Sequence, residues 1–306
     1  TWMEKVDSGL RSIDEDTEVK SYIVELSEQL IGCFDGLELV DKYDVYEVLL
    51  TKEEWCVVEE SGRYIIDRND FSCTIDSEKI TFDKVFIIIH GDPGENGLLQ
   101  AYFEMLDIPF IGSSSLVTAI AFDKYACKSY LRGKGVNLAK DLYIRKGEEI
   151  SPDEILKELK LPVFVKPTNG GSSFGVSKVK KAEELPAALE VAFKEGDGVL
   201  IEEGIVGREI DCGVYKDSKG SHALPLIEIV SKNEFFDYEA KYLGASDEIC
   251  PAPLDEQTTL RVQEEAVKIF DILGCTGLMR YDFMVTAEGI PYFLDSFCSY
   301  GCLNQG

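Results

Sequence analysis

Hydrophobic runs in the first 120 residues alternate with polar turns at intervals that favour short strands and helices. The segments 37–50 and 85–89 are strand-like, and the second is apolar throughout, as in a strand covered on both faces. A glycine-rich turn follows at 90–97, and the pattern then predicts a helix over 98–106 and a short strand over 109–113. This strand–loop–helix order predicts an α/β sheet with a ligand crevice beyond the carboxyl ends of its strands.

Two further patterns follow along the chain. Helical periodicity spans 115–133, after which short strands and helices alternate over 141–145, 151–160, 163–167, 182–194 and 198–203. Long alternating strands then occur at 209–216, 223–230, 277–286 and 290–297, with a helix at 256–273. We therefore predict three domains, at 1–120, 121–205 and 206–306, and a polar, aromatic lid loop at 231–250 in the last.

Composition excludes several classes of protein. The chain has 306 residues, and its net charge of −26 repels nucleic acid and anionic membrane, so neither is predicted as a partner. No apolar run of 18 residues occurs, and the first 20 residues lack a signal-peptide core. The nine cysteines are scattered without a C-x-x-C pair, which predicts a reducing cytoplasm. Two histidines, His90 and His222, are too few for most histidine-based metal sites.

Lys166 lies in the segment that carries most information about chemistry. The run Val163–Lys166 brings the lysine to the end of a strand, and a loop with three glycines, Ser172 and Ser173 follows. Glycine lets several backbone N–H groups approach one anion, and the lysine adds a positive charge. The pattern indicates a polyphosphate site, although a glycine-rich hairpin with a surface lysine would read the same way.

Two other segments have the composition of nucleotide-contacting edges. Glu202 and Glu203 end a strand, where backbone groups can read an adenine and a carboxylate can bind ribose hydroxyls. An acidic hairpin is the alternative. Lys241 and Tyr242 end the aromatic loop, where they could reach a phosphate or close over a substrate; a solvated loop tip is the alternative.

A third constellation combines an arginine with carboxylates on adjacent strands. Arg280 and Asp282 are two residues apart on one predicted strand and therefore share a face, while Asp295 lies on the next strand. Such carboxylates suit Mg²⁺, and an arginine beside them could stabilise a developing oxyanion. The alternative is a surface ion pair in an edge hairpin.

The order of these segments resembles that of the D-alanine–D-alanine ligase family, which has the ATP-grasp fold. The resemblance covers roughly residues 80–295 and rests on His90–Gly97, Phe122–Lys128, Phe164–Val179, Glu202–Glu209, Phe236–Tyr242, Cys250–Ala252 and Gly274–Phe283. It implies three α/β domains with ATP between the central and C-terminal ones, and a homodimer. It also implies that ATP phosphorylates one D-alanine and that the amine of a second attacks the acylphosphate, giving D-alanyl-D-alanine for peptidoglycan synthesis.

The resemblance also implies roles for individual residues. The predicted ATP-binding residues are Lys124, Lys166, Ser173, Glu202, Glu203, Ile205, Glu209 and Lys241. The predicted catalytic residues are Arg280, Ser172, Tyr242 and Gly301, and Tyr242 favours D-alanine over D-lactate as the second substrate. His90 and Glu15 are predicted near the first D-alanine, and Asp282 and Asp295 as ligands of Mg²⁺, with Mn²⁺ as an alternative ion.

Both ends of the chain depart from the family pattern. Residues 5–20 lack the expected strand and paired glycines, so Glu15 or Asp16 is the candidate carboxylate there. Phe297 stands where the family has an asparagine, and a phenyl ring cannot bind a metal. Two alternatives to an active D-alanine ligase therefore stay open: a catalytically weakened, ligase-like ATP-binding protein, and another ATP-grasp carboxylate–amine ligase.

Overall fold

The computed structural model describes residues 44–89, 91–170, 174–231 and 246–297. Of these, residues 44–85 and 105–109 form one compact unit, and the remainder form a second. The first unit contains an antiparallel sheet with the order β1-β2-β3 and the hairpin β4-β5. Their bounds are β1 Glu47–Leu50, β2 Trp55–Glu59, β3 Gly62–Ile65, β4 Cys73–Ile75 and β5 Glu78–Ile80.

The next elements along the chain are short and differ in part from the sequence expectation. β6 (Val85–Phe86) and β7 (Phe110–Ile111) form a two-stranded sheet, and α3 (Leu98–Met105) matches the predicted helix. The strand expected over 85–89 is only two residues long, and β7, its partner, has the same length.

The single helix expected over 115–133 is divided into α4 (Ser115–Phe122) and α5 (Lys124–Leu131). Asp123 between them is extended, with φ −87° and ψ 111°, and its carboxylate accepts a hydrogen bond from the Ala126 N–H at 2.7 Å. An aspartate in this conformation is a strong helix N-cap. The break therefore places Lys124 in the first turn of α5.

A four-stranded antiparallel sheet follows, with the strand order β10-β9-β11-β8. Its strands are β8 Asp141–Arg145, β9 Val163–Pro167, β10 Ser177–Val179 and β11 Gly198–Glu203. The accompanying helices are α6 Pro152–Glu158, η1 Ala182–Glu184 and α7 Leu185–Glu195. Buried residues of α6 and α7 share one hydrophobic core with Val163, Val165 and Ile201 of the sheet. Lys166 and Glu202 lie on the polar face, since Lys166 is opposite Leu200 and Glu202 is two residues farther along.

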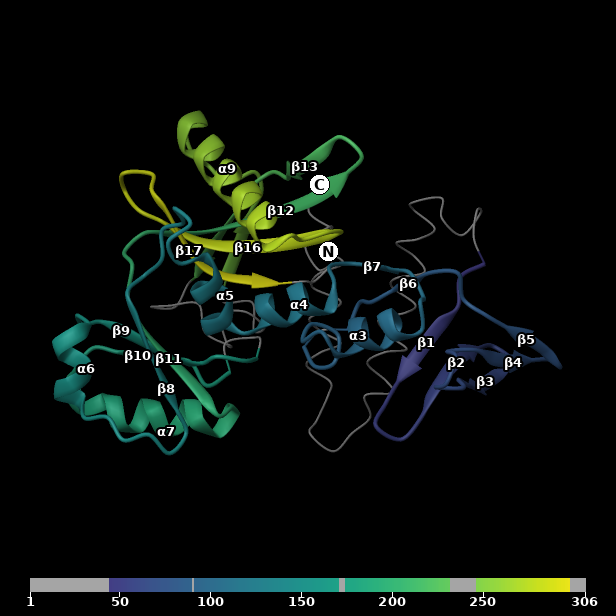
Figure 1. Ribbon diagram of the computed structural model, residues 1–306. Coiled ribbons are helices and arrows are strands. Elements are labelled where there is room, and N and C mark those ends of the chain that lie inside the picture. The colour runs from purple at the N-terminus through teal and green to yellow at the C-terminus, as the bar shows by residue number, and fades with distance from the viewer. Residues whose placement is uncertain (1–43, 90, 171–173, 232–245, 298–306) are drawn as a thin grey trace. The chain divides into compact units, whose positions relative to one another are not determined.

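The largest sheet is also antiparallel, with the order β15-β14-β12-β16-β17 and with β13 paired to β12. Its strands are β12 Arg208–Asp217, β13 Gly220–Ala223, β14 Ile227–Ser231, β15 Ser246–Ile249, β16 Leu278–Val285 and β17 Pro291–Phe297. Helix α9 (Glu256–Leu273) lies against β12 and β16 and buries Val262, Ala266 and Phe270 (Figure 1). α9 begins at the cap Asp255 and ends at Gly274, whose φ of 73° favours glycine.

Two expectations for this region need correction. The strand predicted over 223–230 is divided into β13 and β14, because Pro225 lies between them and cannot donate a ladder hydrogen bond. The predicted loop 231–250 contains β15, which pairs with β14, and residues 232–245 lie outside the described residues.

The second unit has two hydrophobic cores. One joins the sheet of β8–β11 to α6 and α7, and the other joins α4 and α5 to α9 and the largest sheet. The proposed domain boundaries near 120 and 205 stay a prediction. Within the described residues, every helix is too short or too polar to cross a lipid bilayer.

Candidate active site

The register of the largest sheet lines up three carboxylates on neighbouring strands. Asp211 of β12 is directly opposite Asp282 of β16, and Asp282 is opposite Asp295 of β17. Directly opposed residues in antiparallel strands point to the same face, with Cβ atoms about 4.5–5.5 Å apart. We call Asp211, Asp282 and Asp295 the carboxylate row.

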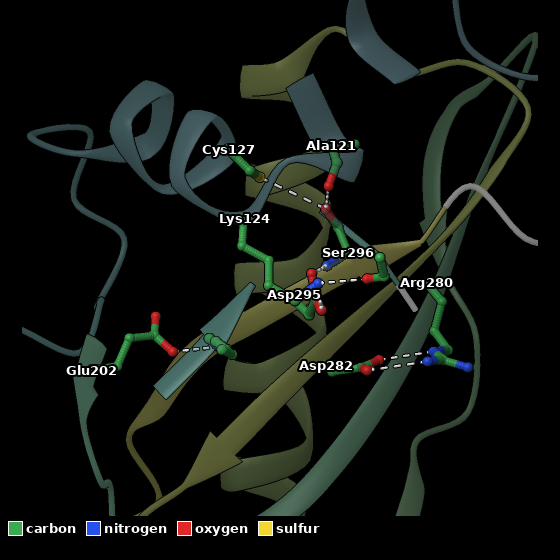
Figure 2. A network of polar contacts seen from close by, with 10 residues as sticks. Ala121, Lys124, Cys127, Glu202, Arg280, Asp282, Asp295 and Ser296 are labelled. Carbon is green, nitrogen blue, oxygen red and sulfur yellow. Dashed lines mark hydrogen bonds and ion pairs between the residues drawn. The ribbon is translucent and has the colours of Figure 1, made fainter. Parts of the chain in front are cut away.

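Arg280 is the cation nearest the middle of this row. Its Nε donates to Asp282 Oδ1 at 2.8 Å and its Nη2 to Asp282 Oδ2 at 3.1 Å, and Figure 2 shows this two-pronged contact. Arg280 Nε also lies 3.6 Å from Asp211 Oδ2. The guanidinium carbon stands 4.4 Å from the centre of the Phe297 ring, its neighbour on β17. Arg280 is thus fixed from two sides.

Asp211 is the member of the row with an unsatisfied atom. It is only 7% exposed, and its Oδ1 accepts no hydrogen bond. Burial, followed by the negative charge of Asp282, raises the pKa of the Asp211 carboxyl well above its usual value, and the nearby Arg280 only partly opposes this. An acidic side chain in this position is costly unless a further positive group approaches it.

Lys124 connects the row to the glycine-rich loop. Its Nζ donates to the Gly170 carbonyl oxygen at 2.9 Å and lies 3.1 Å from Asp295 Oδ2. In Figure 2 the Lys124 side chain points at Asp295. A small pocket opens here, lined by Glu95, Phe122, Lys124, Gly170, Asp295, Ser296 and Phe297. The pocket brings residues from α5, the loop after β9 and β17 to one place.

Four further charged residues form a buried cluster that we call the lysine network: Lys128, Lys166, Asp141 and Glu202. Lys128 is completely buried and forms ion pairs with Glu202 and with Asp141, the latter at 2.8 Å. Lys166 pairs with the other oxygen of Glu202. Two positive and two negative charges thus neutralise one another in the network, and the more exposed Arg132 adds a second cation to Asp141, at 2.9 Å.

The pKa values of Lys166 and Glu202 reflect this pairing. Burial opposes the charge of each, but the partners prevail: Glu202 and then Asp295 raise the pKa of Lys166. In the same way Lys166 and Lys128 lower the pKa of Glu202. Both groups are therefore held charged, and Asp295 of the carboxylate row contributes to the pKa of Lys166.

The other predicted residues fall into two groups. Glu203 Oε1 accepts a hydrogen bond from the Lys160 N–H at 2.8 Å. Ile205 is half-buried after β11. Glu209 is half-buried on β12, two residues before Asp211. Seven candidates lie outside the described residues: Glu15, His90, Ser172, Ser173, Lys241, Tyr242 and Gly301.

The donor set suits a hard cation that brings further ligands with it. Nowhere in the described ranges do three His, Cys, Asp or Glu side chains gather closely enough to hold a metal ion by themselves. Asp282 and Asp295 are nevertheless directly opposed on one face. Mg²⁺ is commonly bound by one or two carboxylates together with phosphate oxygens and water, so these residues fit Mg²⁺ carried by a nucleotide.

Comparison with known proteins identifies the family. Residues 37–113 match the model for the D-ala D-ala ligase N-terminus, and residues 131–297 match that for the D-ala D-ala ligase C-terminus. The chain belongs to the D-alanine–D-alanine ligase family. The D-alanine–D-alanine ligase of Phocaeicola vulgatus is 49% identical over 247 residues, covering 80% of this chain and 76% of that protein.

Solved structures agree with this family assignment. The VanG D-Ala:D-Ser ligase from Enterococcus faecalis superposes with a TM-score of 0.79 at 29% identity, covering 91% of this chain and 87% of that one. A D-alanine–D-alanine ligase from Bacillus anthracis, complexed with ATP, gives a TM-score of 0.61 at 31% identity and covers 71% and 68% of the two chains. The predicted ATP-grasp fold and the ligase class are thereby confirmed.

Sequence reasoning missed two residues that the fold places in these clusters. Asp211 lies two residues after Glu209 on one strand, so the period of two already put it on the same face. Lys128 was quoted within a motif but given no role, although it is four residues after Lys124 and hence on the same side of α5. The pairing of distant strands, which a single sequence does not reveal, shows why both matter.

Proposed function

We propose that this protein joins two D-alanine molecules into D-alanyl-D-alanine for peptidoglycan synthesis, converting ATP to ADP and phosphate. The single observation that carries the proposal is the convergence of Lys124, Gly170 and Asp295, one member of the carboxylate row, at one pocket. The names of the curated relatives support the choice of D-alanine.

In the proposed reaction, a carboxylate oxygen of the first D-alanine attacks the terminal phosphorus of ATP and ADP leaves. The amine of the second D-alanine then attacks the acyl carbon, loses a proton and displaces phosphate. In this proposal Lys124 and Lys166 neutralise phosphate charge, and the Arg280 guanidinium stabilises the negative charge that develops on the acyl oxygen. Mg²⁺ between Asp282 and Asp295 would neutralise further phosphate charge when bound.

The lysine network serves this chemistry indirectly. Asp141 holds Lys128, Lys128 holds Glu202, and Glu202 in turn holds Lys166 near the end of β9. A lysine fixed in this way loses little conformational freedom when a phosphate arrives, which is how a site for phosphoryl transfer is prepared. Glu203, Ile205 and Glu209 are the proposed contacts of adenine and ribose.

The acceptor is the finer part of the proposal. The VanG structure is titled a D-Ala:D-Ser ligase, while the curated relatives at higher identity are D-alanine–D-alanine ligases. We favour D-alanine on that ground and on the resemblance at Tyr242, and we keep D-serine and D-lactate as competitors in the test.

A second candidate function is an ATP-binding, ligase-like protein with weakened turnover. The observation that favours it is Phe297, whose ring packs on Arg280 at a position where a metal-binding side chain would face the pocket. Turnover separates the two candidates, because both would bind ATP.

The test measures phosphate release and product formation by the purified full chain with ATP and Mg²⁺, without any amino acid, with D-alanine alone, and with D-alanine together with D-serine or D-lactate as a competing acceptor. We expect release to depend on D-alanine and to yield D-alanyl-D-alanine. Phosphate release that is unchanged by every acceptor would contradict the proposal and favour the weakened homologue. Formation of D-alanyl-D-serine in preference to D-alanyl-D-alanine would retain the ligase and correct the acceptor.

Cellular setting and assembly are proposals of the same kind. ATP and free D-amino acids are substrates available in the cytoplasm, which is the proposed compartment. The homodimer implied by the family is testable by light scattering on the eluting protein, where a mass near 34.2 kDa would contradict it.

A further inference from the structure

We propose that Asp211 is a further cation ligand of this site, binding Mg²⁺ beside Asp282 while nucleotide phosphate oxygens complete the shell. The inference deepens the proposed function and rests on it for the identity of the nucleotide. It assigns a role to a residue on β12, the strand that also carries the proposed ribose contact Glu209.

The first support is the unsatisfied atom. Asp211 is 93% buried on the sheet face that Asp282 shares, and its Oδ1 has no hydrogen-bond partner. Its Oδ2 lies 3.6 Å from Arg280 Nε, beyond a normal hydrogen bond. Buried polar atoms are rarely left unsatisfied in folded proteins, so this oxygen has the character of a ligand atom without its ligand.

The second support is the balance of charge. Asp295 is matched by Lys124, at 3.1 Å, whereas among the described residues Asp211 and Asp282 share one cation, Arg280. With Asp211 ionised, this part of the site carries one excess negative charge before a nucleotide brings more. A divalent ion held by both carboxylates would reverse the imbalance and attract the phosphates.

The third support is the lack of oxygen ligands in the side chains that flank Arg280 on the neighbouring strands. The next row of the sheet consists of Gly213, Arg280 and Phe297, and neither flanking residue carries an oxygen ligand in its side chain. Mg²⁺ requires oxygen donors. Outside Asp282 and Asp295, the carboxylate that the register places beside them is therefore Asp211.

The experiment compares the wild type with Asp211→Asn, which keeps the shape of the side chain and removes its charge. The readout is the Mg²⁺ concentration that half-saturates the thermal shift of the full chain at saturating ADP. We expect Asp211→Asn to need about tenfold more Mg²⁺. ADP binding in EDTA should be unchanged or tighter, because a negative charge near the phosphates is gone. Asp217→Asn, an exposed aspartate at the far end of β12, should behave like wild type.

An unchanged Mg²⁺ requirement in folded Asp211→Asn overturns the inference and makes Asp211 a buried structural neighbour of Asp282. A second measurement covers the case in which the variant does not fold: a crystal structure of the wild type with Mn²⁺ and ADP. Mn²⁺ bound to an Asp211 oxygen supports the inference, and Mn²⁺ bound elsewhere overturns it. Dipeptide formation is not the readout, so a wild type that shows this Mg²⁺ dependence without making dipeptide overturns the proposed function alone.

Discussion

The lysine network and the carboxylate row lie in the same unit of the protein, yet they solve the problem of buried charge in opposite ways. In the lysine network, two lysines face two carboxylates, and each ion has a partner within the protein. In the carboxylate row, three carboxylates face Arg280 and Lys124, and Asp211 retains an unsatisfied oxygen. The first is neutralised within the protein, whereas the second, in our proposal, is completed by a bound cation.

This difference separates two kinds of functional residue. Members of the lysine network position one another, so substituting them should chiefly lower the free energy of unfolding. In our proposal, members of the carboxylate row interact with a bound ligand, so substituting them should reduce ligand binding and turnover more than stability. Substitutions in the two clusters can therefore test whether the distinction holds.

The largest effect is expected from Lys128→Met, which removes the fully buried ammonium of the lysine network. Asp141 and Glu202, opposite each other on β8 and β11, would lose the buried charge between them and keep only Arg132 and Lys166, respectively. Breaking a buried pair from one side costs about 3–5 kcal/mol of unfolding free energy, to be measured by urea denaturation. The control is Lys146→Met, which breaks the exposed pair with Asp197 and should cost less than about 1 kcal/mol. Equal costs for the two variants would contradict the assigned role of burial.

The substitution Arg280→Met, beside the carboxylate row, should chiefly lower turnover. Loss of a donor to a developing oxyanion typically lowers kcat about 100-fold to 1,000-fold, and dipeptide formation measures it. The matched control is Arg208→Met, which removes another two-pronged arginine–carboxylate pair, with Glu228, from the same strand system. Similar kcat losses in both variants would mean that Arg280 acts only through the stability of the sheet.

The two clusters should also respond to pH with opposite signs. The pKa of Glu202 is lowered in the folded protein, so its contribution to stability is present above its ordinary value near 4.5 and is lost as pH falls below it. The pKa of Asp211 is raised in the folded protein. The stability of the fold should therefore decrease progressively as pH rises above 3.8, the ordinary pKa of an aspartate.

Unfolding free energies measured in EDTA between pH 3 and pH 7 test these signs. The advantage of wild type over Glu202→Gln should shrink on acidification, and its disadvantage relative to Asp211→Asn should grow as pH rises. Parallel curves for wild type and Asp211→Asn would show that burial of this carboxyl carries no electrostatic cost.

The sequence sufficed for features that depend on local pattern or on motif order. The strand ending in Lys166, the helix over 98–106 and the shared face of Arg280 and Asp282 follow from periodicity, and the family follows from ordered motifs. Features that depend on register between distant strands were out of reach. The position of Asp211 opposite Asp282 joins residues 71 apart, and nothing local to either predicts that pairing.

The smallest effect is expected from Phe297→Leu, which keeps apolar bulk beside Arg280 and removes the aromatic face 4.4 Å from its guanidinium. Such a contact is worth about 0.5–1 kcal/mol at a site that retains some exposure. Phe297→Tyr, which keeps the ring, is the control. The two substitutions Arg280→Met and Phe297→Leu, made singly and together, isolate the coupling in a cycle of urea denaturation measurements. A coupling free energy near zero would mean that the Phe297 ring only fills space and does not stabilise Arg280. A coupling free energy as large as the loss caused by Lys128→Met would mean that Phe297 stabilises Arg280 as strongly as the partners in the lysine network stabilise one another. The contrast between the two clusters would then be wrong.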